Sequence, residues 1–153
     1  MRITGISLAL LTTVGLVAGT TALAAPASAA SKIQIVKVRF DSAGNDFPVT
    51  NKKVNDEYVV IKNTDNVTRS LTGWTLEDRS NHLFTFGPTR LKAGASLKVR
   101  TGSGDNTTKN KYQDRRYYVW NNTSDTAYLR NTQDSGGDTC SWKTSDPGST
   151  KAC

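Results

Sequence analysis

Short segments in which apolar and polar side chains alternate recur along this chain, and they constrain its fold more than any other feature. In Glu57–Asn63, for example, Val59 and Ile61 fall on one side of an extended chain and the residues between them on the other. A period of two is typical of a β-strand with one buried face. No segment after Ala30 carries a long apolar stripe of period 3.6. The chain is therefore expected to form β-sheets and no long helix.

The alternating segments are nearly evenly spaced and are separated by Gly, Pro, Asn and Asp, the residues of tight turns. About eight strands are predicted: Lys32–Phe40, Glu57–Asn63, Leu71–Glu77, His82–Phe86, Ser96–Thr101, Arg116–Trp120, Ala127–Arg130 and Asp138–Trp142. Phe47–Asn55 and Gly102–Lys111 are expected to be loops, and Gly73 indicates a bulge or a close backbone approach. Many short strands joined by turns predict an all-β sandwich or barrel. Its expected core is Val59, Ile61, Trp74, Leu76, Phe84, Phe86, Leu97, Val99, Val119 and Leu129.

The first 29 residues have the composition of a secretory signal peptide. Arg2 is their only charged side chain, and Ala27-Ser28-Ala29 fits a signal peptidase site with cleavage before Ala30. The alternative is a retained membrane anchor, since about 20 apolar residues can span a bilayer. Interspersed Thr and Gly make the stretch only weakly apolar, and no basic cluster follows it. We expect a secreted protein with one domain at 30–143 and a C-terminal tail at 144–153.

Cys140 and Cys153 are the only cysteines. In an oxidising compartment an even number of cysteines predicts a disulfide, which would tie the otherwise loose tail Lys143–Ala152 to the last strand. Twelve residues lie between the two cysteines, and closing such a loop stabilises a fold by about 3 kcal/mol in the chain-entropy model. Free or intermolecular thiols are the alternative. A metal site is not expected, because two thiols and one histidine do not complete a tetrahedral ligand set.

Positive charge is concentrated between Arg90 and Arg116. This window has eight basic and two acidic residues, whereas the eleven basic and eleven acidic residues in the rest of the exported chain cancel. Such a window attracts nucleic acid, anionic wall polymers or lipid headgroups; the alternative is a solvated surface without a partner. The candidate polyanion-binding residues are Lys98, Arg100, Lys109, Lys111, Arg115 and Arg116.

Basic and aromatic residues interleave in Lys109–Tyr112 and in Arg115–Tyr118. Proteins that bind single-stranded nucleic acid combine backbone-tracking charge with base stacking in this way. The alternative is that alternate aromatic side chains pack into the core while the basic ones face water.

Four blocks in a fixed order resemble the lamin tail domain family: Asn55–Asn63, Leu71–Asp78, Val119–Asn122 and Asp125–Leu129. The resemblance covers about residues 32 to 142. It implies an immunoglobulin-like β-sandwich that acts in binding or assembly and has no catalytic residue. Related modules occur alone or beside hydrolases in exported bacterial proteins, so the resemblance implies a bacterial, single-domain member. The cysteine pair with its tail and the strongly basic segment Lys109–Arg116 depart from the family pattern.

His82 is the only histidine, and any Ser–His–Asp arrangement would require it. On an alternating aromatic strand it is expected to be a half-buried sheet residue. The carboxylates Glu57, Glu77 and Asp78 lie in the family blocks and are expected to be structural hydrogen-bond acceptors.

Calcium at Asp125, or at Asp134 with Asp138, is the remaining alternative for a metal, since hard cations need clustered oxygens. We expect no cofactor, no metal and no catalytic residue. The expected function is that of an exported structural, adhesive or binding module with an unknown protein or anionic polymer as its partner. The alternatives are an electrostatic binder of nucleic acid or wall polymer through the 90–116 window and, third, a small secreted hydrolase.

Overall fold

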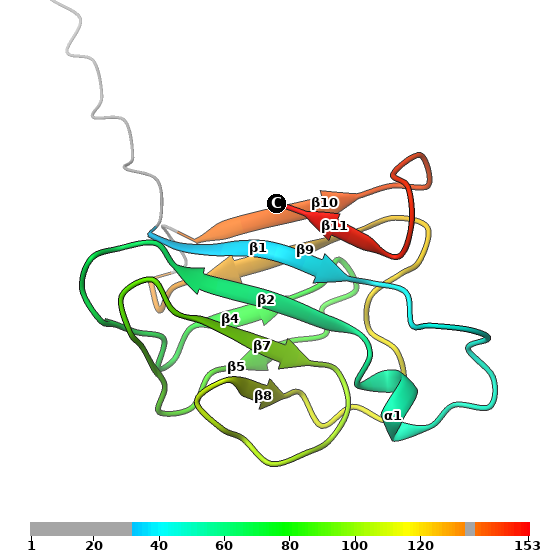
Figure 1. Cartoon of the computed structure of the whole chain (residues 1–153), viewed down its shortest axis with the longest axis horizontal. Coiled ribbons are helices and arrows are strands. Elements are labelled where there is room, and N and C mark those ends of the chain that lie inside the picture. The colour runs from blue at the N-terminus through cyan, green and yellow to red at the C-terminus, as the bar shows by residue number, and fades with distance from the viewer. Residues whose placement is uncertain (1–31, 134–136) are drawn as a thin grey trace, which may run out of the picture.

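The computed structural model describes residues 32–133 and 137–153 as two sheets packed face to face (Figure 1). One sheet has five strands in the order β11-β1-β2-β7-β8, and the other has four in the order β10-β9-β4-β5; β3 and β6 form a separate ribbon. The elements are β1 (Ile33–Arg39), α1 (Asn51–Val54), β2 (Tyr58–Asn63), β3 (Arg69–Ser70), β4 (Thr75–Glu77), β5 (Phe84–Thr85), β6 (Arg90–Leu91), β7 (Ser96–Arg100), β8 (Asn110–Tyr112), β9 (Asp125–Arg130), β10 (Asp138–Trp142) and β11 (Thr150–Ala152). The predicted all-β sandwich is confirmed.

The core lies between the two sheets and is built from the inward residues of the alternating segments. Of the ten expected core residues, eight are buried, while Trp74 and Phe84 are partly buried and pack against them. Aromatic side chains tie the layers together: the ring of Trp142 stacks on Phe40 at 5.1 Å and meets Trp120 edge-on at 6.0 Å. Burial of each large side chain contributes about 1.5–3 kcal/mol before conformational entropy is subtracted.

Six predicted strands are confirmed to within two residues, namely β1, β2, β5, β7, β9 and β10. The predicted strand Leu71–Glu77 is shortened to β4, because the Trp74 amide donates to the Leu71 carbonyl (2.9 Å) and closes a turn. Gly73 in this turn has φ +78°, and a Cβ added there would lie 2.9 Å from Thr132 Cγ2. The close approach predicted for this glycine is therefore present.

The predicted strand Arg116–Trp120 is wrong. Val119 and Trp120 are adjacent and both buried, so burial does not alternate here as it does in β2 and β7. The Val119 amide donates to a carboxylate oxygen of Glu57 (3.0 Å) instead of to a neighbouring strand. A tertiary hydrogen bond therefore holds this segment.

Three short elements lie where loops or loose chain were predicted. Helix α1 begins after Thr50, whose hydroxyl accepts from the Lys53 amide (3.3 Å), within the expected loop Phe47–Asn55. Strand β8 lies at the end of the expected loop Gly102–Lys111 and pairs parallel to β7. Strand β11 pairs antiparallel to β1, so the tail is not loose.

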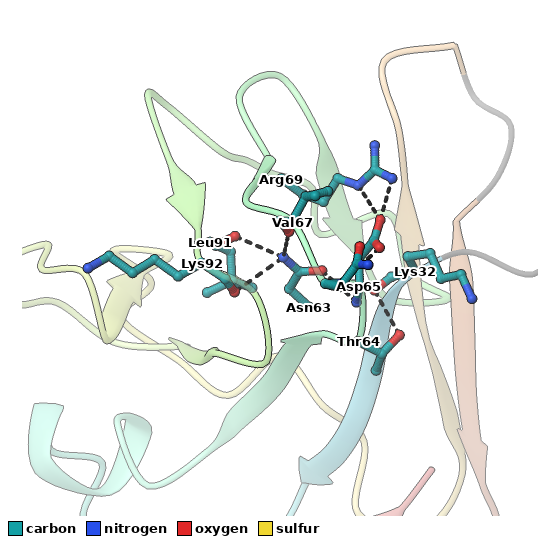
Figure 2. A network of polar contacts seen from close by, with 9 residues as sticks. Lys32, Asn63, Thr64, Asp65, Val67, Arg69, Leu91 and Lys92 are labelled. Atoms are coloured by element: carbon teal, nitrogen blue, oxygen red, sulfur yellow. Dashed lines mark hydrogen bonds and ion pairs between the residues drawn. The ribbon is translucent and has the colours of Figure 1, made fainter.

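A polar network centred on Asn63 closes one end of the sandwich (Figure 2). This side chain is fully buried, and its amide donates to the carbonyls of Val67 (2.8 Å), Leu91 (2.9 Å) and Lys92 (3.2 Å). Its carbonyl accepts from the Asp65 amide (3.0 Å). One asparagine thus joins the end of β2 to the turn before β3 and to the corner between β6 and β7.

The expected disulfide is present. Cys140 on β10 and Cys153 after β11 are bonded, with their Cα atoms 5.8 Å apart. Because β10 and β11 belong to different sheets, the bond links the two layers as well as the tail.

Removing this bond with the double substitution Cys140→Ala and Cys153→Ala is expected to lower the free energy of unfolding by about 2–3 kcal/mol, because the unfolded chain gains the entropy of the open loop. Urea denaturation measures the change. Reduction of the parent protein should reproduce the stability of the variant. Equal midpoints for the oxidised parent and the variant would contradict the expectation.

Candidate functional site

The outer face of the five-stranded sheet gathers basic side chains from three strands. In the register of the sheet, Tyr58 on β2 lies between Arg39 and Arg100, and Val60 lies between Lys37 and Lys98. Directly paired residues project to the same side of a sheet, and the residues flanking these positions are buried in the core. We call this surface the cationic face; its basic residues are Lys37, Arg39, Lys62, Lys98 and Arg100.

The charges of the cationic face are largely uncompensated. Over residues 32–133 and 137–153, its one ion pair joins Arg39 to Asp56 at 2.8 Å. Lys37 is exposed, and Lys62 and Lys98 are half-buried. None of these three ammonium groups forms an ion pair with the described residues. Basic side chains without local counter-ions create a positive potential that attracts anions.

Arg100 also has a structural role. Its Nε donates to Asn110 Oδ1 (3.0 Å) on β8, and its Nη1 donates to the Asn55 carbonyl (2.7 Å) at the end of α1. Lys98 Nζ lies 4.5 Å and Arg100 Cζ 5.8 Å from the centre of the Tyr58 ring. These cation–π contacts fix the two basic side chains over the middle of the sheet.

The six predicted polyanion-binding residues do not form one surface. Lys98, Arg100 and Lys109 line a hollow of ≈ 350 Å³ beside Val60 on the cationic face. Lys111 is in register with the buried Val99 and lines a different hollow, with Phe84 and Thr85.

Arg115 is placed near β5, because its Nη2 donates to the Leu83 carbonyl (3.0 Å), and Arg116 next to it is exposed. In turn, Lys37, Arg39 and Lys62 were missed, because the charges of the exported chain outside residues 90–116 sum to zero. The signal that could have found them is their outward position on predicted strands, read together with the strand pairing.

Glu57 is the most unusual ionisable group of the fold. It is fully buried at the start of β2, and one carboxylate oxygen accepts from the Val119 amide (3.0 Å). Burial raises the pKa of Glu57 to about 8, although the amides of Val119 and Trp120 and the Thr101 hydroxyl favour the charged form. The expected role of Glu57 as a structural acceptor is confirmed, and its enclosure leaves no room for a substrate.

His82 is not on a strand, which corrects the expectation for it. It lies in the turn between β4 and β5, where its Nδ1 lies 2.7 Å from Asp78 Oδ2. Asp78 is buried and also accepts from the backbone amides of Ser80 (2.9 Å) and His82 (2.7 Å). The expectation that Asp78 is a structural acceptor is confirmed, because this carboxylate organises the turn.

The carboxylates considered for calcium already have partners within the fold. Asp125 accepts from the amides of Arg79 and Asn121 (both 3.1 Å), and Asp138 accepts from the Ile35 amide (2.8 Å). Asp134 lies outside the described residues. Among those that are described, no three His, Cys, Asp or Glu side chains are grouped so as to hold a metal ion. Nor does the same part of the chain contain a helix long and apolar enough to cross a membrane.

The sequence profile of a family described as Lamin Tail Domain matches residues 26–144, well over half of the chain. Compared with curated proteins, the sequence shows no significant match. Of the eleven strands in the described residues, the matched region includes ten, β1 to β10, and ends before β11.

Proposed function

Since the chain belongs to the lamin tail domain family, whose members are non-catalytic β-sandwich modules, we propose that it functions by binding, as an exported module at the cell surface or outside the cell. A disulfide between Cys140 and Cys153 supports a location in an oxidising compartment. The signal-like composition of residues 1–29, which lie outside the described part, supports export from a bacterial cell.

The ligand class that the surface favours is an anionic polymer. The observation that carries this proposal is the cationic face, where basic residues from β1, β2 and β7 lie side by side. Among the described residues, only one of these basic side chains, Arg39, forms an ion pair. A secreted hydrolase receives no such support. His82, the residue it would need, is hydrogen-bonded to the buried Asp78, but among the described residues no serine or threonine hydroxyl is hydrogen-bonded to its other ring nitrogen.

The exported protein is expected to bind heparin and anionic envelope fractions at low ionic strength and to elute as salt is raised. Binding that neutralises several charges releases counter-ions, so affinity falls steeply with salt concentration. The measurement is the salt concentration at elution, with a pull-down against envelope fractions and DNA at two salt concentrations. A protein that flows through heparin at low salt would overturn the proposal.

A further inference from the structure

The aromatic rings on the cationic face are covered, whereas proteins that bind nucleic acid by base stacking expose theirs. Resting on the function proposed above, we infer that the cationic face itself is the binding site and that it recognises a linear phosphodiester polymer by its charge, without contacting bases. A chain of repeated phosphates is therefore sufficient as a ligand, whether or not its units carry aromatic rings. Single-stranded nucleic acid is bound only through its backbone.

The first step of the argument is the arrangement of the charges. Neighbouring strands lie about 4.8 Å apart and alternate residues about 6.8 Å apart along a strand. Lys37 and Lys98, on either side of Val60, are therefore separated by two strand spacings, and Arg39 and Arg100 are separated likewise around Tyr58. The four positions form a grid of about 10 by 7 Å. A single small anion cannot reach all of them, whereas a chain of repeated charges can.

The second step is that the rings on this face are covered. The Tyr58 ring lies under Lys98 and Arg100. The ring of Tyr112, in register with Arg100, packs against Gly104 so closely that a Cβ added to this glycine would lie 2.6 Å from the ring. Base stacking requires an open aromatic face. The cationic face offers none, so it can read charge alone.

The third step separates this face from the other basic region. Two aromatic rings of the described residues are largely exposed, those of Phe47 (82%) and Tyr117 (72%), and Tyr117 directly follows the basic pair Arg115 and Arg116. Arg115 is bonded to the Leu83 carbonyl, which places this region by β5 of the other sheet. If bases were bound by stacking, Tyr117 beside this basic pair would be a candidate site. The two regions can therefore be tested against each other.

The test compares two single-stranded probes of equal length and charge, about 20 units each: oligothymidylate and an abasic deoxyribose-phosphate oligomer. Fluorescence anisotropy at fixed low salt measures their affinities for the oxidised protein. We expect the two affinities to agree to within about twofold, because both probes present the same phosphates. The substitutions Lys37→Glu and Lys98→Glu together should weaken binding of both probes by at least about tenfold.

The matched control is the pair Arg115→Glu and Arg116→Glu, which changes the net charge equally and should alter affinity by about threefold or less through long-range charge alone. Thermal unfolding of each variant verifies its fold. Tighter binding of oligothymidylate by more than about fivefold would overturn the inference, because bases would then contribute. Loss of binding in the 115/116 pair but not in the 37/98 pair would overturn it too, yet leave the proposed function standing. If neither probe binds, the inference is overturned; the proposed function is overturned as well only if the protein also flows through heparin at low salt.

Discussion

Replacement of Asn63 by leucine is expected to lower the free energy of unfolding by about 4 kcal/mol. Leucine has a similar volume but neither donates nor accepts a hydrogen bond. The substitution would leave the carbonyls of Val67, Leu91 and Lys92 and the Asp65 amide without their present partner. Each polar group that loses its partner while buried costs about 1–3 kcal/mol. Water reaching the outer carbonyls offsets part of that cost.

Urea denaturation of the oxidised protein measures this effect, with Thr64→Val as the matched control. The Thr64 hydroxyl donates to the Lys32 carbonyl (3.0 Å), which also accepts from the Thr64 amide (2.8 Å), and the side chain is exposed. Its loss should therefore cost less than about 1 kcal/mol. Equal destabilisation by the two substitutions would show that Asn63 is not the centre of the network. A loss of about 4 kcal/mol is a large share of the 5–15 kcal/mol typical of a domain.

The second large effect concerns pH. The folded protein holds Glu57 with a pKa of about 8, against an ordinary value of 4.5. Between these values the folded state binds a proton that the unfolded state has released, so stability falls as pH rises. The fall begins near pH 4.5 and is complete above pH 8, and it amounts to about 5 kcal/mol.

The substitution Glu57→Gln is expected to remove most of this pH dependence and to make the protein more stable than the parent at pH 9. The carboxamide oxygen can still accept from the Val119 amide, and it never ionises. Urea denaturation midpoints of the parent and the variant at pH 5, 7 and 9 would measure the pH dependence of stability. Glu77→Gln on β4, where the side chain is half-buried, is the matched control and should keep the slope of the parent. A slope unchanged by Glu57→Gln would mean that Glu57 is not the group responsible.

Two other carboxylates titrate outside this range. Arg69 lowers the pKa of Asp65, and Lys151 lowers that of Asp146. Their stabilising contribution is present above their ordinary value of 3.8 and is lost as pH falls through their lower folded values. They do not interfere with the slope attributed to Glu57.

The parts of the fold that could be predicted from sequence are those in which local alternation and tertiary burial agree. Strands β2 and β7 are examples, since Val59, Ile61, Leu97 and Val99 point inward at every second position. Strand β8 has no aliphatic residue and forms through its backbone pairing with β7 and the hydrogen bond between Arg100 and Asn110. Neither cause is visible in a local pattern.

The segment Arg116–Trp120 shows the opposite case, a predicted strand that does not form. Its residues favour a strand, but the buried carboxylate of Glu57, 62 positions earlier, binds the Val119 amide. The predicted polyanion-binding residues differ from the cationic face for a related reason. The prediction followed charge along the chain, whereas the sheet brings together charges from different strands: Lys37 and Lys98 lie on either side of Val60 although they are 61 positions apart.

The pairing of β11 with β1 affects the order in which the molecule can be completed. Lys37 is paired with Ala152, so the first strand acquires its outer neighbour only after nearly all of the intervening chain has been made. Until then one edge of β1 has no partner in its sheet, and the disulfide across the layers cannot close. Pairing between such distant residues is slow. A nascent chain that crosses a membrane from its N-terminus would therefore stay incompletely folded throughout its passage, and it would reach its final form only on the far side.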